Sequence, residues 1–525
     1  MIWEHREMPI EKKREEILNA ALALGILGFL VLIGITNLCH YRYALDADIA
    51  SDAVLGKLIW DSKEIVPGTW YIAEETRLIC MPNAAALFYG LTHNMTMSAG
   101  LACCAMTALI LWSALFFGKA LRFQKKELLL FGFLCLMLPA DSTLLELSYL
   151  YASYYAVHVA VLFFTFGVYL EARREKSIKW IKPSAAAVLS LILGMQGARG
   201  ILMIYGPLFG MEALWSLYDI YCGKKKERAD IFISLWAAAL LAVSFLGMCF
   251  PFSKGQELSR NIRNGFSKLC IEVVPDMLAA MGFGESQPLL WKIGAAALLL
   301  TALYLIIDIV IRIFKREGVK TAEWGFLILC SSPAVTALMV AFTTVESTER
   351  YYFLSSYAAA YAEILFFRKM REAGKPWYRM RFCLAFVTAT LSIVCFYHNY
   401  LPVLRAEEPP RTDAAEVVRF LEENDFRTAY STFENANTMT VLSNGRIRVA
   451  AVASVEKMDI CKWMSSTDWY VPYMPFEAVT AYVIPETQLD AFDVFLAAHE
   501  DDIRLEAQIG RFYIYRSDYN FSCLE

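Results

Sequence analysis

The sequence lacks the short motifs of several common enzyme classes. It contains no CxxC pair, HExxH helix, P-loop or GxSxG elbow, and these absences remove the usual metal, nucleotide and serine-hydrolase interpretations. Thirteen cysteines among 525 residues are too few for a disulfide scaffold. A formal net charge of −4 gives no basic footprint of the kind that nucleic-acid-binding proteins carry.

Charged residues are also scarce. They make up 19% of the chain, whereas 57% of the residues are hydrophobic and the mean hydropathy is +0.42. Soluble domains usually hold about 25% charged and about 45–50% apolar residues. The charges that are present cluster between long apolar stretches. The sequence therefore predicts a polytopic α-helical membrane protein.

Eleven apolar runs follow one another along the chain. The first, 17–39, is longer than the core of a signal peptide and has no small-residue cleavage site after it, so we interpret it as an uncleaved span. The other runs lie near 94–118, 128–140, 151–170, 183–197, 201–221, 231–250, 289–311, 324–342, 351–367 and 382–398.

The basic residues predict an orientation for these spans. The N-terminal tail and the alternate connections that follow hold 27 Lys and Arg residues, whereas the intervening connections hold 10. The positive-inside rule then places the N-terminus in the cytoplasm and the chain after residue 398 outside. The runs 128–140 and 183–197 are shorter than the roughly 20 residues of a span. Both must still cross, because basic clusters on either side require an even number of crossings.

Residues 400–525 differ in character from the rest of the chain. A proline-containing linker at 407–410 precedes patterns that predict one small α/β domain. We therefore expect two domains, a transmembrane domain at 1–399 with a first outer loop at 40–83, and an extracytoplasmic domain at 400–525. The predicted helices of the second domain are 413–424 and 488–499, and its predicted strands are 428–432, 446–453, 478–484 and 511–515.

The first outer loop carries three acids close together, Asp46, Asp48 and Asp52. In a helix, Asp48 and Asp52 share one face with Ser51. Asp46 or Asp48 could simply be the N-cap of that helix. Acids clustered at a membrane surface also suit a general base or a cation site, so the sequence leaves both interpretations open.

Two arginines lie on the predicted outer side, against the charge bias. Arg199 lies at the tip of the predicted hairpin 183–221, and Arg350 is the one basic residue of the loop 343–350. Each could be an interfacial arginine that extends its charge toward water. The functional alternative is a guanidinium that grips a lipid-linked phosphate with paired hydrogen-bond donors.

The whole arrangement resembles the GT-C integral-membrane glycosyltransferases. Within that class it is most similar to the bacterial family-39-type branch, kin to protein O-mannosyltransferases and lipid A aminoarabinose transferases. The segments that carry the resemblance are Asp48 to Gly56, Trp70 to Arg77, Gly197 to Tyr205 and Glu349 to Tyr351. The sequence departs from the family pattern at Ile49, where a second acid is common, and at Tyr352-Phe353, where Leu-Pro often follows.

The resemblance implies that a sugar moves from a polyprenyl-phosphate donor to an acceptor hydroxyl of an envelope glycan, lipid or protein, outside the plasma membrane. Asp48, or Asp46, would be the base, and Arg350 and Arg199 would bind the donor phosphate. The residues expected to bind substrate are Asp52, Trp70, Tyr71, Glu74, Arg77, Glu349 and Tyr351. No cofactor is obligatory and no metal ligand is assigned, although the sequence leaves open a divalent cation.

A non-catalytic transporter or flippase, or a sensor with an outer ligand-binding domain, is the alternative. A transporter typically has paired halves with broken helices at matching positions, and a proton-coupled pump has acids in its span centres. The sequence has no visible symmetry of that kind, and acids are scarce in the centres of its spans. The glycosyltransferase interpretation is therefore favoured.

The charge bias makes the orientation testable. A reporter that is active only outside the cytoplasm, fused after residue 525, should be active, because the chain after residue 398 is predicted to lie outside. Reporter activity and fusion abundance are measured in the same cells. A silent reporter on a normally abundant fusion would contradict the predicted topology.

Overall fold

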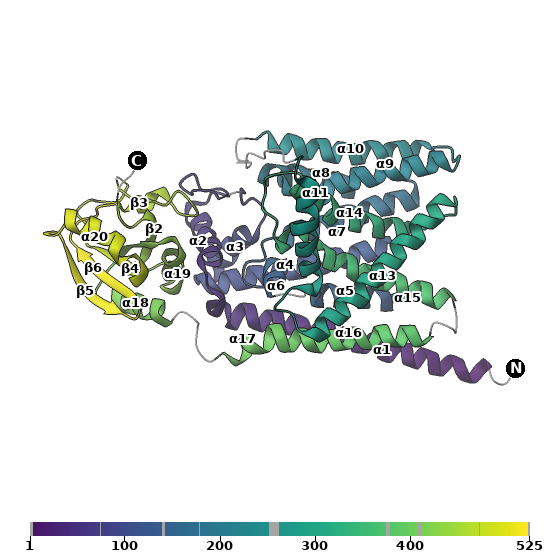
Figure 1. The fold of residues 1–525 in the computed structure, drawn as a ribbon, viewed down its shortest axis with the longest axis horizontal. Helices are drawn as coiled ribbons and strands as arrows, with labels where there is room; N and C mark the ends of the chain where they lie inside the picture. Colours follow the sequence, from purple (N-terminus) through teal and green to yellow (C-terminus); the bar gives the residue numbers. More distant parts are fainter. Residues whose placement is uncertain are drawn as a thin grey trace. The chain divides into compact units, whose positions relative to one another are not determined.

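A computed structural model describes residues 4–73, 75–138, 142–177, 179–250, 262–373, 378–406, 412–471 and 473–522 (Figure 1). Contacts divide the chain into two compact units. Unit 1 comprises residues 1–33, 106–149 and 154–402, and unit 2 comprises residues 34–105, 150–153 and 403–525.

Unit 1 is built of helices. Those that lie wholly or partly in it are α1 (Glu4–Cys39), α4 (Met95–Ala120), α5 (Lys125–Met137), α6 (Ser142–Ser148), α7 (Ala156–Glu175), α8 (Ile181–Gln196), η2 (Ile201–Tyr205), α9 (Gly206–Tyr221), α10 (Arg228–Met248), α11 (Gly265–Lys268), η3 (Leu269–Val273), α12 (Val274–Leu278), η4 (Ala279–Phe283), α13 (Leu289–Phe314), α14 (Thr321–Ala341), η5 (Glu349–Tyr352), α15 (Leu354–Ala373), α16 (Tyr378–Cys395), η7 (Phe396–Tyr400) and α17 (Leu401–Arg405).

Eight helical segments among the described residues are long and apolar enough to cross a membrane. They are Glu15–Cys39, Met95–Ala120, Ala156–Glu175, Ile201–Tyr221, Arg228–Met248, Leu289–Phe314, Thr321–Ala341 and Ala385–Arg405. The other three predicted spans correspond to α5 and α8, which have 13 and 16 residues, and to α15, whose C-terminal half is charged. The chain is thus a multi-pass membrane protein, and the count of eleven spans stays a prediction.

Close contact between α8 and α10 shows how the short apolar helix packs. A Cβ atom on Gly194 would lie 2.1 Å from the carbonyl oxygen of Ser244, and one on Gly247 would lie 2.4 Å from that of Leu191. The hydroxyl of Ser190 donates a hydrogen bond of 2.6 Å to the carbonyl oxygen of Leu240. Small residues and interhelical hydrogen bonds of this kind stabilise helix pairs in lipid, where apolar burial gives little drive.

A buried ion-pair network ties α7 to α9 and α10. The guanidinium of Arg173 contacts both carboxylate oxygens of Glu212, with Nε at 3.1 Å from Oε2. Its Nη1 lies 3.1 Å from the carboxylate of Asp230, and Tyr169 donates a hydrogen bond to Glu212. Because an unpaired charge is costly in an apolar interior, these side chains stabilise one another only as a set.

Unit 2 contains a six-stranded mixed sheet in the order β3-β2-β1-β4-β6-β5. The strands β2 and β4 pair with β1 in parallel, and the other pairings are antiparallel. The elements of unit 2 after the start of the chain are η1 (Tyr41–Ala44), α2 (Ala47–Ser62), α3 (Met81–Thr92), α18 (Thr412–Glu423), β1 (Thr428–Thr432), α19 (Phe433–Leu442), β2 (Arg448–Ser454), β3 (Asp459–Ile460), η8 (Thr467–Trp469), β4 (Thr480–Pro485), η9 (Glu486–Gln488), α20 (Leu489–Ala498), β5 (Ile503–Ile509) and β6 (Phe512–Ser517).

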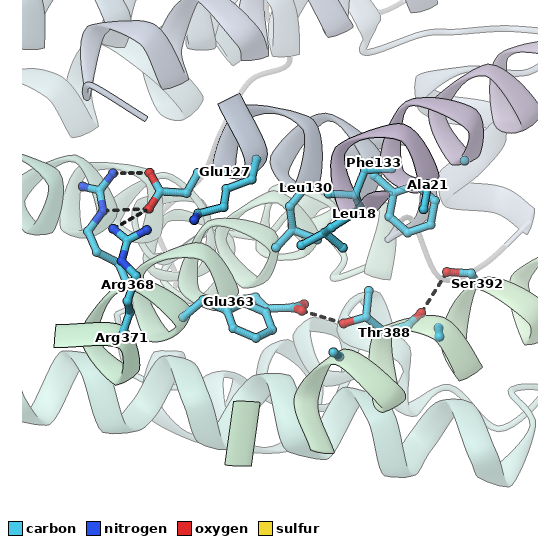
Figure 2. A pocket seen from close by; sticks show the side chains of 16 residues that line it. Leu18, Ala21, Glu127, Leu130, Phe133, Glu363, Arg368, Arg371, Thr388 and Ser392 are labelled. Carbon is cyan, nitrogen blue, oxygen red and sulfur yellow. Dashed lines mark hydrogen bonds and ion pairs between the residues drawn. The ribbon is translucent and has the colours of Figure 1, made fainter. Parts of the chain in front are cut away.

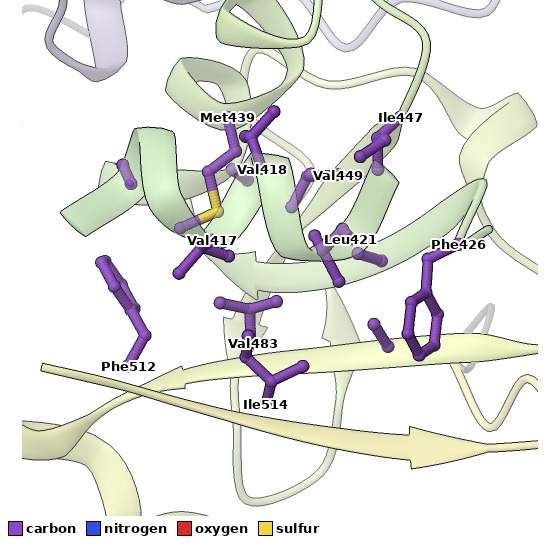
Figure 3. Packing of buried hydrophobic residues seen from close by; sticks show 14 of the residues in the cluster. Val417, Val418, Leu421, Phe426, Met439, Ile447, Val449, Val483, Phe512 and Ile514 are labelled. Atoms are coloured by element: carbon purple, nitrogen blue, oxygen red, sulfur yellow. The ribbon is translucent and has the colours of Figure 1, made fainter. Parts of the chain in front are cut away.

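Alternation along β4 divides the residues of this sheet between two faces. On one face, Val483 packs with Val417 of α18 and Met439 of α19 in a buried apolar core (Figure 3). On the other face, the ring of Tyr482 lies 5.8 Å from that of Phe495 on α20. Helices therefore cover both faces, and the small α/β domain predicted from the sequence is present.

The sequence patterns locate four of the six strands. Predicted strands at 428–432, 446–453, 478–484 and 511–515 correspond to β1, β2, β4 and β6, and the two predicted helices correspond to α18 and α20. The helix α19 and the strands β3 and β5 were not predicted. The predicted linker at 407–410 lies outside the described residues. By sequence alone the two outer cysteines Cys461 and Cys523 could form a disulfide; Cys523 is also outside the described residues, and Cys461 is buried.

The first outer loop belongs to the same compact unit as the sheet. Thr438 of α19 donates a hydrogen bond of 3.3 Å to the carbonyl oxygen of Asp46, and Ser51 of α2 contacts the sulfur of Met464. The amide of Met95 donates to the side chain of Asn444 at 2.8 Å. Contacts thus group residues 34–105 with the sheet. That the chain after residue 399 folds as a separate domain stays a prediction.

The apolar core makes that boundary testable. All the residues of the core in Figure 3 come from residues 414–514, so a fragment 411–525 should fold alone. Amides of β1 and β4 should exchange slowly in the isolated fragment, and those of α19 faster than in the full protein, because α2 is missing. Hydrogen exchange measured by mass spectrometry on both proteins checks this. Uniformly fast exchange in the fragment would show that the sheet depends on the rest of the chain.

Candidate functional site

The two predicted phosphate-binding arginines of unit 1 lie around one buried aromatic ring. Tyr155, the residue before α7, is 4% exposed and stacks on Phe353 with ring centroids 4.9 Å apart. The guanidinium carbon of Arg199 lies 4.2 Å from the centroid of the Tyr155 ring. Arg350 interacts electrostatically with both Tyr155 and Arg199. Two segments far apart in sequence therefore bring their cations within electrostatic range of each other and of Tyr155.

The turn before Arg199 positions its side chain. Helix α8 ends at Gln196, and Gly197 has a φ of 147°, a conformation that other residues rarely adopt. The chain re-enters a helix at Arg199 and continues into the π-helical turn η2, where Ser332 of α14 donates a hydrogen bond to the carbonyl oxygen of Met203. The hairpin predicted from the sequence is present, and its tip presents Arg199.

The loop that carries Arg350 is anchored at several points. Lys268 donates hydrogen bonds to the carbonyl oxygens of Thr343, at 3.0 Å, and Val345. The hydroxyls of Ser347 and Tyr352 lie 3.0 Å apart. These contacts hold the short helix η5 in place at the end of the loop. The backbone that carries the exposed Arg350 therefore has a fixed position in unit 1.

Two other predicted substrate-binding residues flank Arg350. Its guanidinium carbon lies 5.6 Å from the ring centroid of Tyr351, and the half-buried Glu349 begins η5. Burial lowers the pKa of Arg350, and the neighbouring tyrosines raise it by more, so that the net shift is upward and the side chain stays a cation. The charge of Arg199 opposes that of Arg350, so the two guanidinium groups repel each other, and an anion between them would remove that repulsion.

The three acids of unit 2 have different surroundings. Asp46 is the N-cap of α2, and its side chain accepts a hydrogen bond of 2.8 Å from the amide of Ile49. Asp48 follows in the first turn and is exposed, and its carbonyl oxygen accepts a hydrogen bond from Ser51. Asp52, one turn further, is 1% exposed. The N-cap interpretation that the sequence left open therefore applies to Asp46.

Asp52 is a buried carboxyl with a distant counter-charge. The Nε atom of Arg77 lies 3.8 Å from its Oδ1 atom, and neither carboxylate oxygen accepts a hydrogen bond from a described residue. Burial raises the pKa of Asp52 to about 6, which the charge of Arg77 opposes and those of Asp48 and Asp46 reinforce. Burial outweighs the ion pair, so this carboxyl changes its charge near neutral pH.

Trp70 and Tyr71 connect the first outer loop to the sheet domain. Trp70 forms an antiparallel bridge with Ser466, and the amide of Tyr71 donates a hydrogen bond of 2.8 Å to the carbonyl oxygen of Ser465. The ring of Trp70, 8% exposed, lies edge-on to that of Trp469 at 6.4 Å. Their observed contacts are structural, and substrate binding by these two residues stays a prediction. Glu74 lies outside the described residues.

The predicted site residues thus fall into two groups. Arg199, Arg350, Glu349 and Tyr351 lie in unit 1, and the acids, Trp70, Tyr71 and Arg77 lie in unit 2. The convergence of Asp48 with the two arginines stays a prediction. Sequence reasoning missed Tyr155 and Lys268, because one is a tyrosine among several within an apolar run and the other is one of two lysines in a long loop.

The described residues do not form a metal site of the usual kind. No group of three His, Cys, Asp or Glu side chains lies there in a position to hold an ion. The divalent cation that the sequence left open stays untested.

Comparison with known proteins identifies the fold. No family model and no curated protein matches the sequence. Among solved structures, ArnT of Cupriavidus metallidurans is similar at 11% identity over 96% of this chain, with a TM-score of 0.54 to its apo form and 98% of that chain covered. The same protein bound to undecaprenyl phosphate gives a TM-score of 0.59 at 11% identity, with coverage of 96% and 99%.

An oligosaccharyltransferase of Archaeoglobus fulgidus also aligns, in its apo form, at 11% identity and a TM-score of 0.47 over 84% of this chain and 64% of that one. ArnT is a GT-C glycosyltransferase, and its likeness spans nearly the whole of both chains. The structure therefore confirms the predicted fold class in outline, a mostly helical membrane protein with an ArnT-like fold and a small C-terminal α/β domain. The span count and the orientation stay predictions.

The environment of Asp52 predicts a pH dependence of stability. The pKa of Asp52 is about 6 in the folded protein, against an ordinary value of 3.8, so ionisation of this carboxyl opposes folding. The stability that protonated Asp52 contributes is fully present below about pH 4 and is lost as the pH rises through 6. Asp52→Asn removes this ionisation. It should therefore stabilise the protein relative to wild type at pH 7.5, by an amount on the order of 3 kcal/mol at most, and much less at pH 4.5.

Thermal unfolding midpoints of the full-length protein in detergent at both pH values test this. Asp61→Asn, an exposed acid on the same helix, is the matched control and should show no such difference. An Asp52→Asn variant that loses stability relative to wild type as the pH rises would contradict the assignment.

Proposed function

We propose that the protein is a membrane glycosyltransferase that moves a sugar from a polyprenyl-phosphate donor to an extracytoplasmic hydroxyl of an envelope glycan, lipid or protein. The observation that carries this proposal is the meeting of Arg199 and Arg350 around Tyr155 in a chain with the fold of ArnT. The ArnT structure bound to undecaprenyl phosphate supports a donor of this class.

In this proposal, the two guanidinium groups bind the donor phosphate. Breaking the bond between the anomeric carbon and the phosphate oxygen leaves negative charge on the phosphate, and cationic donors stabilise that charge without proton transfer. Arginine suits this role because its planar fork binds two phosphate oxygens together. The stacking of Tyr155 on Phe353 supports a defined position for the guanidinium of Arg199.

A carboxylate of the first outer loop completes the chemistry. The acceptor oxygen forms a bond to the anomeric carbon and transfers its proton to the base, and polyprenyl phosphate leaves. Asp48 is the preferred base, because Asp46 is engaged in capping α2 and Asp48 is exposed. The buried Asp52, one turn further along α2, and the half-buried Arg77 of the loop before α3 lie 3.8 Å apart and help bind the sugar. The proposal requires Asp48 to approach the arginines within about 15 Å, the reach of a sugar phosphate with hydrogen bonds of about 3 Å at each end.

Matched substitutions separate the two roles. Arg350→Lys keeps the charge and loses the paired donors, so undecaprenyl-phosphate binding should weaken about tenfold or more. Asp48→Asn should lower turnover about 10²–10⁴-fold and leave that binding nearly unchanged, because a base acts on the acceptor. Binding is measured with undecaprenyl phosphate, and turnover is measured with a panel of undecaprenyl-phosphate monosaccharides and cell-envelope extract as acceptor.

Arg316→Lys is the control for the first substitution, because Arg316 also lies over a tyrosine, 4.3 Å from the ring centroid of Tyr221, in another loop. It should leave binding unchanged. Full binding by Arg350→Lys, or full turnover by Asp48→Asn, would contradict the assigned role of that residue.

A further inference from the structure

Unit 1 contains a cavity apart from the site around Tyr155. A cavity of about 500 Å³ lies between α1, α5, α15 and α16 (Figure 2). This volume falls within the roughly 300–1,000 Å³ of typical small-molecule pockets. Most of its lining is apolar, including Leu18, Leu22, Leu130, Phe133 and Phe367. None of its lining residues belongs to the site around Tyr155.

The rim of this cavity carries an excess of positive charge. Arg368 and Arg371 share one carboxylate, that of Glu127, at 2.6 Å and 3.4 Å. Lys126, the third cation of the rim, pairs with Glu15 at 3.1 Å. Apart from Glu363, which lies inside the cavity without a cation partner among the described residues, three cations therefore face two carboxylates, and Figure 2 shows both arginine side chains beside Glu127. An anion at the rim would balance the remaining charge.

Inside the cavity lies a carboxyl with one oxygen still available. Glu363 of α15 is 1% exposed, and its Oε1 atom accepts a hydrogen bond of 2.5 Å from the hydroxyl of Thr388 (Figure 2). Its Oε2 atom is buried and has no hydrogen-bonding partner among the described residues. A buried charge without an ion pair is costly, so Glu363 is the neutral acid. Its Oε2–H group then lacks an acceptor among these residues, and a ligand that accepts this hydrogen bond gains affinity.

The depth of Glu363 matches a particular part of a lipid. Five residues separate it from Arg368 along α15, which is about 7.5 Å of helix. One polar headgroup layer of a bilayer is about 5–7 Å thick. If the rim cations lie at the phosphate level, Glu363 lies near the ester linkages of the glycerol backbone. An isoprenoid chain offers no hydrogen-bond acceptor at that depth, whereas the ester carbonyl oxygens of a glycerolipid can accept from the Oε2–H group of Glu363.

We infer that this cavity binds one anionic glycerophospholipid, with its phosphate at Lys126, Arg368 and Arg371, its glycerol backbone at Glu363 and one acyl chain along the apolar lining. The charge bias of the sequence places this end of unit 1 at the cytoplasmic leaflet. The bound lipid fastens α1 to α5, α15 and α16, which form the walls of the cavity. The site is separate from the one proposed for the sugar donor.

Native mass spectrometry of the full-length protein tests this inference. The wild type in detergent is mixed with equal amounts of phosphatidylglycerol, phosphatidylethanolamine and undecaprenyl phosphate, and the retained lipids are quantified. Phosphatidylglycerol should be retained about tenfold more than phosphatidylethanolamine, because only the former has a net negative charge. Equal retention of these two lipids would overturn the proposal, and this comparison requires no variant to fold.

Two substitutions locate the binding. Glu363→Leu removes the hydrogen bond and Arg371→Gln removes a rim cation, so each should reduce retention of phosphatidylglycerol about tenfold. Lys224→Gln, the same charge change at a cytoplasmic-facing residue outside the cavity, should not. Retention of undecaprenyl phosphate should stay unchanged in all three variants. If undecaprenyl phosphate is the lipid that Glu363→Leu releases, or if Lys224→Gln has the same effect as Arg371→Gln, the inference is wrong.

Discussion

The contact of the Arg199 guanidinium with the buried ring of Tyr155, within electrostatic range of Arg350, is the constraint on which the proposed chemistry depends. Tyr155 stacks on Phe353, and Arg199, at the tip of a hairpin of two apolar helices, lies over the Tyr155 ring. Holding two like charges together is unfavourable unless an anion joins them. The fold therefore builds an anion-binding place from segments that are each apolar and otherwise unremarkable in sequence.

Polar groups in each unit are concentrated where they have ion-pair or hydrogen-bond partners. At the basic end of unit 1, Arg173 is surrounded by Glu212 and Asp230, and Arg368 by Glu127. In unit 2, the main chain of the first outer loop pairs with the segment around Ser466, so that an acidic loop and a sheet domain form one compact body. Glu363 and Asp52 are exceptions, because each is a buried carboxyl with an incompletely satisfied charge or oxygen. Such exceptions are typical of places that bind or react.

Much of the fold could be predicted from the sequence because its strongest signals are physical. Apolar runs predict membrane helices, and period-2 patterns predict β1, β2, β4 and β6. The helix α19 was missed because its sequence is rich in Asn, Thr and other poor helix formers, and burial rather than propensity stabilises it. The strand β5 was missed because it is an edge strand with mostly exposed residues. At the site, both arginines stood out by opposing the charge bias, whereas Tyr155 gave no signal, since its role depends on tertiary contacts.

An experimental structure of the full-length protein with undecaprenyl phosphate would test the central claim most directly. The account predicts density for the phosphate between Arg199 and Arg350, with oxygens about 3 Å from both guanidinium groups. A phosphate bound at the Glu363 cavity, or anywhere else that leaves both arginines without contact to it, would contradict the account.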